Sequence, residues 1–361
     1  MNWHTCSTWT LTEDGVAVER GDLQVELAAG ASRVVTVPAR TRVRRGVETH
    51  VTFEWKSRRA TPWAPAGHVV AWDQIELSPE PVSIRPPSRT ATPAVDIDDA
   101  GITEIRLGDR VAVEGDVTAT LWRPPTDNDG IASFFGGDVA TGVRARWQAW
   151  GLHDLESHVD DVAVRKGGTE IVLRRRLAGA DAEATHVTRI SLSADGVDFR
   201  ERIVVPKEWD DLPRVGVRFE VPGDLDRLQW LGLGPDETYP DRKSAATVGR
   251  WTSSVDEQYH PFVKPQDHGA HVETRWFSLS AGRRGFAVSG DELLTFSARH
   301  HHDRSLTNAS TLADLHRNST IEVHVDAAVR GLGTGACGPD TLPAYLVRPG
   351  TWAWTWRINA A

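Results

Sequence analysis

The sequence is poor in residues that cross-link secreted proteins or anchor membrane proteins. Its 361 residues include 2 cysteines, Cys6 and Cys337, which are too few for a disulfide framework. No apolar run approaches the roughly 20 residues that a membrane-spanning helix requires. The opening Met-Asn-Trp-His-Thr-Cys-Ser has no apolar core behind a basic segment, so we expect no secretory signal. These absences predict a reduced, cytoplasmic protein.

Basic residues are in deficit. There are 41 Lys and Arg against 50 Asp and Glu, and the formal net charge is −9. Proteins that bind nucleic acid need clustered positive charge to contact phosphates, so this balance argues against a nucleic acid partner. With 40% hydrophobic and 25% charged residues, the composition is that of a globular protein.

Tyrosine and methionine are scarce, at 3 and 1 residues, whereas tryptophan is abundant, at 15. A tryptophan can fill a core or stack on a sugar ring, and composition does not choose between these roles. The segment 352–358 reads Trp-Ala-Trp-Thr-Trp-Arg-Ile. Because side chains alternate along a strand, its three tryptophans share one face, which favours core packing.

The pattern along the chain is typical of antiparallel β-structure. Asp14-Gly15, Gly108-Asp109 and Asp195-Gly196 each separate two alternating runs, which predicts hairpins. Alternation of apolar residues over 215–221 predicts a strand with one buried face. Helix signals are few, and the best of them predicts a helix from Asp138 to Gly151. The sequence therefore predicts an all-β, sandwich-like fold.

Prolines mark one domain boundary. They are frequent over residues 78–97, and proline favours extended linkers over the interior of a sheet. We therefore predict an immunoglobulin-like sandwich over residues 1–77, a linker over 78–97 and one large β-domain over 98–361.

The segment 121–130 crowds side-chain oxygens into one turn. It reads Leu-Trp-Arg-Pro-Pro-Thr-Asp-Asn-Asp-Gly, so Asp127, Asn128 and Asp129 are followed by Gly130. Such oxygens can bind a hard cation or sugar hydroxyls. The alternative, which the residues alone favour, is a turn in which they satisfy their own backbone.

The segment 230–243 reads Trp-Leu-Gly-Leu-Gly-Pro-Asp-Glu-Thr-Tyr-Pro-Asp-Arg-Lys. Its Gly-x-Gly has no third glycine at dinucleotide spacing, so a nucleotide site is not predicted. Glu237 and Asp241 could form an acid/base pair. A structural contact between Asp241 and Arg242 is the favoured interpretation.

Cysteine and histidine give no further catalytic signal. Cys337 lies in the glycine-rich segment 331–340 without a basic neighbour that would activate its thiol. The consecutive histidines 300–302 alternate faces in a strand, so we predict no metal site there. For His268 and His271 we favour surface or structural roles.

Taken together, the motifs resemble the C-terminal portion of a glycoside hydrolase family 2 β-galactosidase. They also follow the order in which that family carries them. The resemblance rests on the segments 122–130 and 230–243, Pro-Gln-Asp-His-Gly at 265–269 followed by Thr-Arg-Trp at 274–276, and Gly-Leu-Gly-Thr-Gly-Ala-Cys-Gly-Pro at 331–339.

The resemblance implies an immunoglobulin-like domain followed by a large supersandwich of the galactose-mutarotase type. It also implies that both catalytic glutamates lie in an upstream barrel that this chain lacks. We therefore expect no catalytic residue, metal site or cofactor here, and a divalent cation in the barrel. The implied partners are that barrel or a large subunit, and galactosides through a composite site. Homo-oligomer formation stays open, as does whether the chain is an excised piece or a natural small subunit.

The resemblance also assigns roles to individual residues. It places Asp127, Asn128, Asp129 and Gly130 in a loop that gates the active-site mouth, with the glycine as its hinge. Some family members place a tryptophan against the sugar where this chain has Cys337 and Gly338. Structural roles are implied for the remaining motif residues, Trp122, Arg123, Glu237, Tyr239, Asp241 and Arg242.

Two other functions remain open from the sequence. One is a free-standing carbohydrate-binding protein that stacks sugars on exposed tryptophans. The other is an aldose epimerase, which needs a histidine acid facing a glutamate base across one pocket. Glu237 or Glu273 with His268 or His271 are its candidates, and their spacing favours no particular pair.

Overall fold

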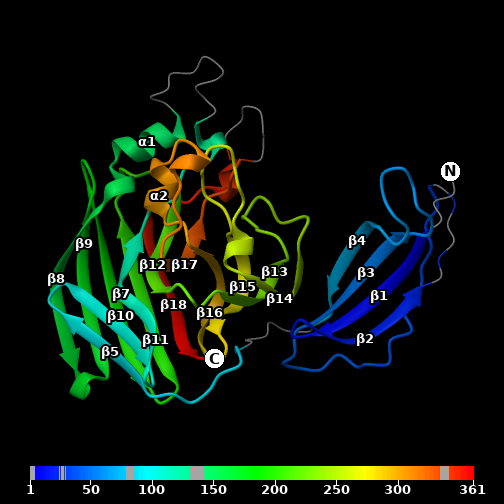
Figure 1. Ribbon diagram of the computed structural model, residues 1–361, viewed down its shortest axis with the longest axis horizontal. Coiled ribbons are helices and arrows are strands. Elements are labelled where there is room, and N and C mark those ends of the chain that lie inside the picture. Colours follow the sequence, from blue (N-terminus) through cyan, green and yellow to red (C-terminus); the bar gives the residue numbers. More distant parts are fainter. Residues whose placement is uncertain are drawn as a thin grey trace. The chain divides into compact units, whose positions relative to one another are not determined.

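The computed structural model describes residues 5–23, 25, 28, 30–78, 85–130, 142–333 and 341–361. The chain separates into two compact units, Met1–Ile84 with Thr247–Arg250 and Arg85–Ala246 with Trp251–Ala361. Strands are the main regular elements of each unit (Figure 1). The predicted all-β class is therefore confirmed.

The smaller unit contains a four-stranded antiparallel sheet in the order β2-β1-β3-β4. Its strands are β1 (Thr5–Glu13), β2 (Val16–Leu23), β3 (Thr49–Ser57) and β4 (Val69–Glu76). Trp9, Leu11 and Val51 are buried on one face, and Val37 packs against them. An immunoglobulin-like sandwich has two sheets, whereas the described residues of this unit form a single four-stranded sheet, so the immunoglobulin-like sandwich stays a prediction.

The larger unit is organised around a sheet in the order β5-β6-β7-β12-β17-β16-β18-β11-β10-β9-β8, with β15 pairing to β16, β13 to β15 and β14 to β13. Its first strands are β5 (Pro93–Asp98), β6 (Gly101–Leu107), β7 (Arg110–Thr120), β8 (Glu156–Arg165), β9 (Glu170–Ala178), β10 (Glu183–Ser193) and β11 (Gly196–Val205). The others are β12 (Arg214–Pro222), β13 (Arg227–Gly234), β14 (Thr247–Ser254), β15 (His271–Ala281), β16 (Arg284–Arg299), β17 (Thr320–Val329) and β18 (Gly350–Ala360).

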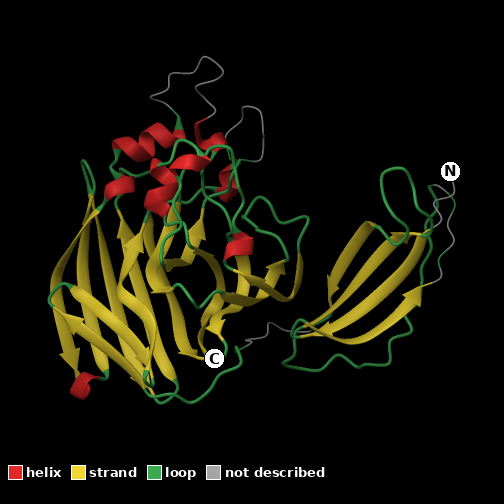
Figure 2. Ribbon diagram, in the orientation of Figure 1, coloured by secondary structure: helices red, strands yellow, loops and turns green. Residues whose placement is uncertain are grey.

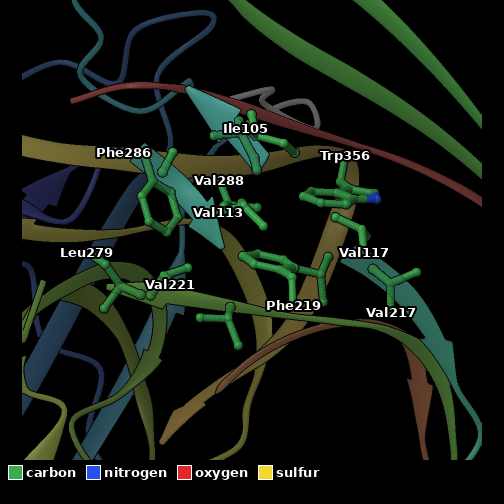
Figure 3. Close-up of a cluster of buried hydrophobic side chains, with 14 of the residues drawn as sticks. Ile105, Val113, Val117, Val217, Phe219, Val221, Leu279, Phe286, Val288 and Trp356 are labelled. Atoms are coloured by element: carbon green, nitrogen blue, oxygen red, sulfur yellow. The ribbon is translucent and has the colours of Figure 1, made fainter. Parts of the chain in front are cut away.

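Alternating apolar residues of these strands form the core of the larger unit (Figure 3). The ring of Trp356 is stacked between Phe199, at 4.0 Å between centroids, and Phe219, at 5.5 Å. Its indole Nε1 donates a hydrogen bond of 3.1 Å to Glu201 Oε1. Trp147, Trp209, Trp230 and Trp276 are also fully buried. Seven of the described tryptophans are thus buried, these five together with Trp9 and Trp122, and they fill cores because a large aromatic ring buries much apolar surface.

The predicted linker extends too far. The boundary between the units falls after Ile84, and β5 begins at Pro93, so residues 93–97 belong to the large sheet. Proline is tolerated there because it is the first residue of a strand at the sheet edge, where no ladder donor is needed. Proline content therefore indicated where the two units separate but not how long the linker between them is.

The predicted turns and helix are found with small shifts. Gly15 and Gly108 have φ of 75° and 67°, as tight hairpins require. The third turn is Ala194-Asp195, one residue earlier than predicted. Gly196 instead lies in β11, where a Cβ would come within 2.4 Å of the Ile358 carbonyl oxygen. The helix α1 spans Val143–Ala149 and is followed by Gly151 with φ of 73°, whereas Asp138 lies outside the described residues.

Candidate functional site

The four motif segments meet at one end of the larger unit. Strand β12 pairs with β7 on one side and β17 on the other, both antiparallel. The chain therefore leaves β7 and β17 beside the start of β12, and the segments after them begin as neighbours. Most of the helical segments of this unit gather at the same end (Figure 2).

The turn at residues 126–130 is built around Asp129. Asp129 Oδ2 accepts hydrogen bonds from the amide and hydroxyl of Thr126, at 2.7 and 3.0 Å. Asp129 Oδ1 accepts a 2.9 Å hydrogen bond from Arg123, and both side chains are buried. The turn thus satisfies its own backbone through a buried carboxylate, as the favoured interpretation predicts for this residue.

The other two acceptor residues of the turn reach different segments. The amide of Asp127 donates to Gln266 Oε1 at 2.8 Å. The side-chain amide of Asn128 donates to the carbonyl oxygen of Leu332 at 3.0 Å. Among the described residues, the atom nearest to a Cβ on Gly130 would be Arg144 Cδ, at 4.0 Å. The base of the predicted gating loop is therefore anchored at both residues.

Asp241 anchors the start of the glycine-rich segment. Its Oδ1 and Oδ2 accept hydrogen bonds of 2.9 Å each from the amides of Leu332 and Gly333. A Cβ on Gly331 would lie 2.7 Å from the Asp241 carboxylate, so glycine permits this close approach. The predicted contact between Asp241 and Arg242 is wrong, because the chain reversal brings residues 331–333 to the carboxylate instead.

Arg242 pairs with Glu237. Its guanidinium donates to Glu237 Oε1 at 2.9 Å, and Glu237 Oε2 accepts a 2.8 Å hydrogen bond from the Gly269 amide. Both oxygens of Glu237 are therefore engaged in structural contacts, as are both oxygens of Asp241. This arrangement gives no support to an acid/base pair formed by these two residues.

A cleft of about 390 Å³ opens beside this motif. Its lining includes Glu237, Arg242, Tyr259, His260 and Phe262. Aromatic rings and charged groups thus border a common space next to the residues that resemble the family motif.

Below these segments lies a buried polar network. Tyr239 Oη donates to Asp267 Oδ2 at 2.8 Å, and Arg299 donates to Asp267 Oδ1 at 2.7 Å. Burial opposes ionisation of Asp267, but Arg299 and Arg214 outweigh it and hold its pKa below the usual range. Burial raises the pKa of Tyr239, and Asp267 adds to that effect. The network therefore holds charged groups in defined positions.

The helix α1 packs against the first motif. The guanidinium groups of Arg123 and Arg330 lie 5.7 and 5.6 Å from the Trp147 ring. Trp122 meets the same ring edge-to-face at 6.3 Å and donates to Thr307 Oγ1 at 3.0 Å. These contacts fit the structural roles that the resemblance implies for Trp122 and Arg123.

The histidines named as epimerase candidates have separate partners. His268 contacts the Gln266 carbonyl oxygen at 3.0 Å, and His271 contacts Gln258 Oε1 at 2.7 Å. Burial, aided by Arg299, lowers the pKa of His268 to about 4, and burial lowers that of His271 to about 3. Neutral imidazoles of this kind are structural rather than acids at neutral pH.

The glutamate candidates are equally occupied. Glu273 forms an ion pair with Lys243, and Glu237 bonds to Arg242 and Gly269. None of these contacts joins a candidate glutamate to a candidate histidine. Within the described part of the chain, the acid and base of an epimerase are therefore not assembled from these residues.

Gln266 and Arg330 are residues of the site that the sequence analysis did not predict. Gln266 and Arg330 anchor the loops; Arg330 donates to Asp211 at 3.1 Å. The only sequence signal for them is position: Gln266 lies inside the motif at 265–269, and Arg330 directly precedes Gly331. Cys337 and Gly338 fall outside the described residues.

Comparisons with known families match almost the whole chain. The family described as "Beta galactosidase small chain" matches residues 89–358, and "Beta-galactosidase, domain 4" matches residues 2–78. The β-galactosidase of Arthrobacter sp. (strain B7) is 31% identical over 98% of this chain and 38% of its own length. That of Aeromonas hydrophila subsp. hydrophila is 28% identical over 96% of this chain and 35% of its own length.

The chain thus spans less than two-fifths of the length of these relatives. Among solved structures, a galactose mutarotase-like protein from Lactobacillus casei covers 76% of the chain at 11% identity, with a TM-score of 0.39. Within the described residues, we find no helix both long enough and apolar enough to cross a membrane.

Proposed function

Because the chain belongs to the β-galactosidase small-chain family, we propose that it is the C-terminal, non-catalytic part of a β-galactosidase of glycoside hydrolase family 2. Such an enzyme hydrolyses terminal β-galactosides with retention, through two carboxylic residues about 5 Å apart. These residues, and the divalent cation of the enzyme, would lie in a barrel outside this chain. We further propose a cytoplasmic location, because 2 cysteines are too few for the disulfide framework that is typical of secreted proteins.

The observation that carries the proposal is the anchoring of two motif segments to each other. Asn128 bonds to Leu332, and Asp241 bonds to Leu332 and Gly333, so residues 126–130 and 331–333 share one base. Two loops that leave a common rigid base can form one wall of an active-site mouth. The partner barrel or large subunit would complete that mouth around a galactoside.

This chain would contribute to the enzyme by holding two loops in place at the active-site mouth. Asp129 and Arg123 are buried as an ion pair at the root of the first loop, and Asp241 holds the root of the second. Roots held in this way would position both loops at the active-site mouth. Gly130 would serve as the hinge, because a glycine there can change its backbone angles freely.

The test compares the purified chain with the chain combined with the polypeptide encoded immediately upstream. We expect no hydrolysis of o-nitrophenyl β-D-galactoside by the chain alone, and hydrolysis once the two are combined. Asp241→Asn should weaken the combined activity, whereas Lys166→Ala, in an exposed ion pair with Glu170, should not.

Hydrolysis by the chain alone would contradict the proposal. Saccharide binding by the chain alone, seen as a change in tryptophan fluorescence, together with no activity in the combination, would instead favour a free-standing carbohydrate-binding protein.

A further inference from the structure

Three side chains from separate segments of the larger unit converge outside the site described above. Asp226 precedes β13, Asp256 begins the short helix η5 (Asp256–Gln258), and His300 follows β16. His300 Nε2 lies 3.5 Å from Asp226 Oδ1 and 3.9 Å from Asp256 Oδ1. All three atoms lie within 4.8 Å of one another.

The hydrogen bonds of His300 define which ring nitrogen carries the proton. Its side chain is 1% exposed, and Nδ1 lies 3.3 Å from the carbonyl oxygen of Thr320. A carbonyl can only accept, so Nδ1 is the protonated nitrogen and Nε2 presents a lone pair. A histidine whose other nitrogen donates to a backbone carbonyl is oriented as metal-binding histidines are.

Three acceptor atoms therefore face the same space, and such an arrangement is stable only around a cation. In this structure Arg317 provides the positive charge. Its guanidinium donates to His300 Nε2 at 2.7 Å and to Asp256 Oδ1 and Oδ2 at 3.1 and 3.3 Å. The Arg317 side chain is 50% exposed, so it can withdraw into solvent.

Arg317 donates hydrogen bonds to His300 and Asp256, whereas Asp226 is the third acceptor of the cluster. Its Oδ1 atom is buried and accepts no hydrogen bond from the described residues, while the Asp226 side chain as a whole is 39% exposed. A buried carboxylate oxygen without a donor carries a desolvation cost that a bound cation would remove. The unfilled acceptor therefore points to a ligand of positive charge beside His300.

A second cluster in the same unit shows why the first is distinctive. Asp303, Glu322 and His324 also converge, and all are buried. However, Arg214 donates to His324 Nδ1 at 2.6 Å, so the proton is on Nε2, facing Glu322 at 3.3 Å and Asp303 at 3.5 Å. No lone pair faces these carboxylates, and the second cluster is an ion network rather than a metal site.

We propose that Asp226, Asp256 and His300 form a binding site for a divalent transition metal ion such as Zn²⁺, and that Arg317 occupies it when the ion is absent. Ligands about 2.1 Å from a tetrahedral Zn²⁺ lie about 3.4 Å apart, and His300 Nε2 lies 3.5 and 3.9 Å from the two carboxylate oxygens. One nitrogen and two carboxylate oxygens leave the fourth position to water. The ion would add a link between three segments, two of which are already joined by the 2.9 Å hydrogen bond from the Val255 amide to the Asp226 carbonyl oxygen.

The test uses Co²⁺ as a spectroscopic probe for the Zn²⁺ site in the untagged full chain. Tetrahedral Co²⁺ absorbs strongly in the visible range, and added Zn²⁺ should displace it. We expect one equivalent to bind, and His300→Asn to weaken binding by at least about 100-fold, the upper end for loss of an outer-shell partner. Asp226→Asn should act in the same direction.

Arg317→Gln removes the competing cation and should strengthen binding about tenfold. The control is His158→Gln, because His158 is 50% exposed beside Glu156 and resembles an adventitious surface site. Zn²⁺ should also raise the melting temperature of the wild-type chain and not that of His300→Asn, since a ligand stabilises only the state that binds it.

Three results would overturn the proposal. The first is no tetrahedral Co²⁺ spectrum in either wild type or Arg317→Gln. The second is unchanged binding in His300→Asn. The third is binding by Arg317→Gln alone, because the cluster would then be a closed ion pair in the native protein.

Discussion

Asn128 donates a side-chain hydrogen bond of 3.0 Å to the carbonyl oxygen of Leu332, across 204 residues of sequence. This bond joins the turn after β7 to the glycine-rich segment after β17. Since the amide of Leu332 is held by Asp241, one residue is fixed from both sides. The two loops proposed to line the active-site mouth therefore share a common base.

The anchor at Asp241 predicts a measurable loss of stability. Asp241→Asn keeps the shape of the side chain but replaces one acceptor oxygen with a donor that faces a backbone amide. We expect the free energy of unfolding to fall by about 1–3 kcal/mol, measured in urea. Arg242→Gln is the control, because it removes only an exposed partner of Glu237 and should cost less than about 1 kcal/mol. Equal effects of both variants would contradict this assignment.

The two glycines of the loop bases should respond differently to alanine. A Cβ at position 331 would lie 2.7 Å from the Asp241 carboxylate. At Gly130, the nearest atom among the described residues would be Arg144 Cδ at 4.0 Å. Gly331→Ala is expected to lower the free energy of unfolding by about 1–3 kcal/mol, as overpacking does. Gly130→Ala should change it by less than about 0.5 kcal/mol. Thermal and urea unfolding of both variants test this, and an unaffected Gly331→Ala would count against the close approach.

The buried pair of Arg123 and Asp129 predicts a larger effect. Arg123→Ala leaves the Asp129 carboxylate buried without its guanidinium partner. Arg330 Nη1 stays 3.8 Å from Asp129 Oδ1. We expect a loss of about 3 kcal/mol, because the buried carboxylate loses its hydrogen-bonded guanidinium and keeps only this more distant one. Lys166→Ala, which opens an exposed pair with Glu170, should cost no more than about 1 kcal/mol. Urea unfolding measures the free energy of unfolding of both variants. A loss of similar size in the two would refute the buried-pair argument.

Asp326 predicts a dependence of stability on pH. Burial raises the pKa of its carboxyl to about 7, although Arg214 acts in the opposite direction. The folded protein thus holds this proton more tightly than the unfolded chain, whose aspartates titrate near about 3.9. The stabilising contribution is complete below about pH 4 and is lost as the pH rises through about 7.

Asp326→Asn removes this titration. The free energy of unfolding of wild type relative to Asp326→Asn should therefore fall between pH 5 and pH 8. Urea unfolding of both proteins at several pH values measures the difference, and a difference that stays constant across this range would disprove the shift.

Much of the fold was predictable because strand signals are local. Alternation along residues 215–221 and the turn at Gly108 depend only on neighbours in sequence, and both are present in the structure. The motif segments indicated the family, and the matches of residues 89–358 and 2–78 to two β-galactosidase families confirm it. By contrast, β5 was placed in a linker because the sequence does not show that Pro93 begins an edge strand.

The sequence by itself determined the β-class, the boundary region between the two units and the membership of the family. Only the tertiary structure decided which groups meet: Asp241 with Leu332 instead of Arg242, and Asp226 with Asp256 and His300. The physical reason is that the alternation of apolar and polar side chains along a strand depends only on neighbouring residues. The contact between Asp241 and Leu332, which are 91 residues apart, depends on the register and order of every strand between them.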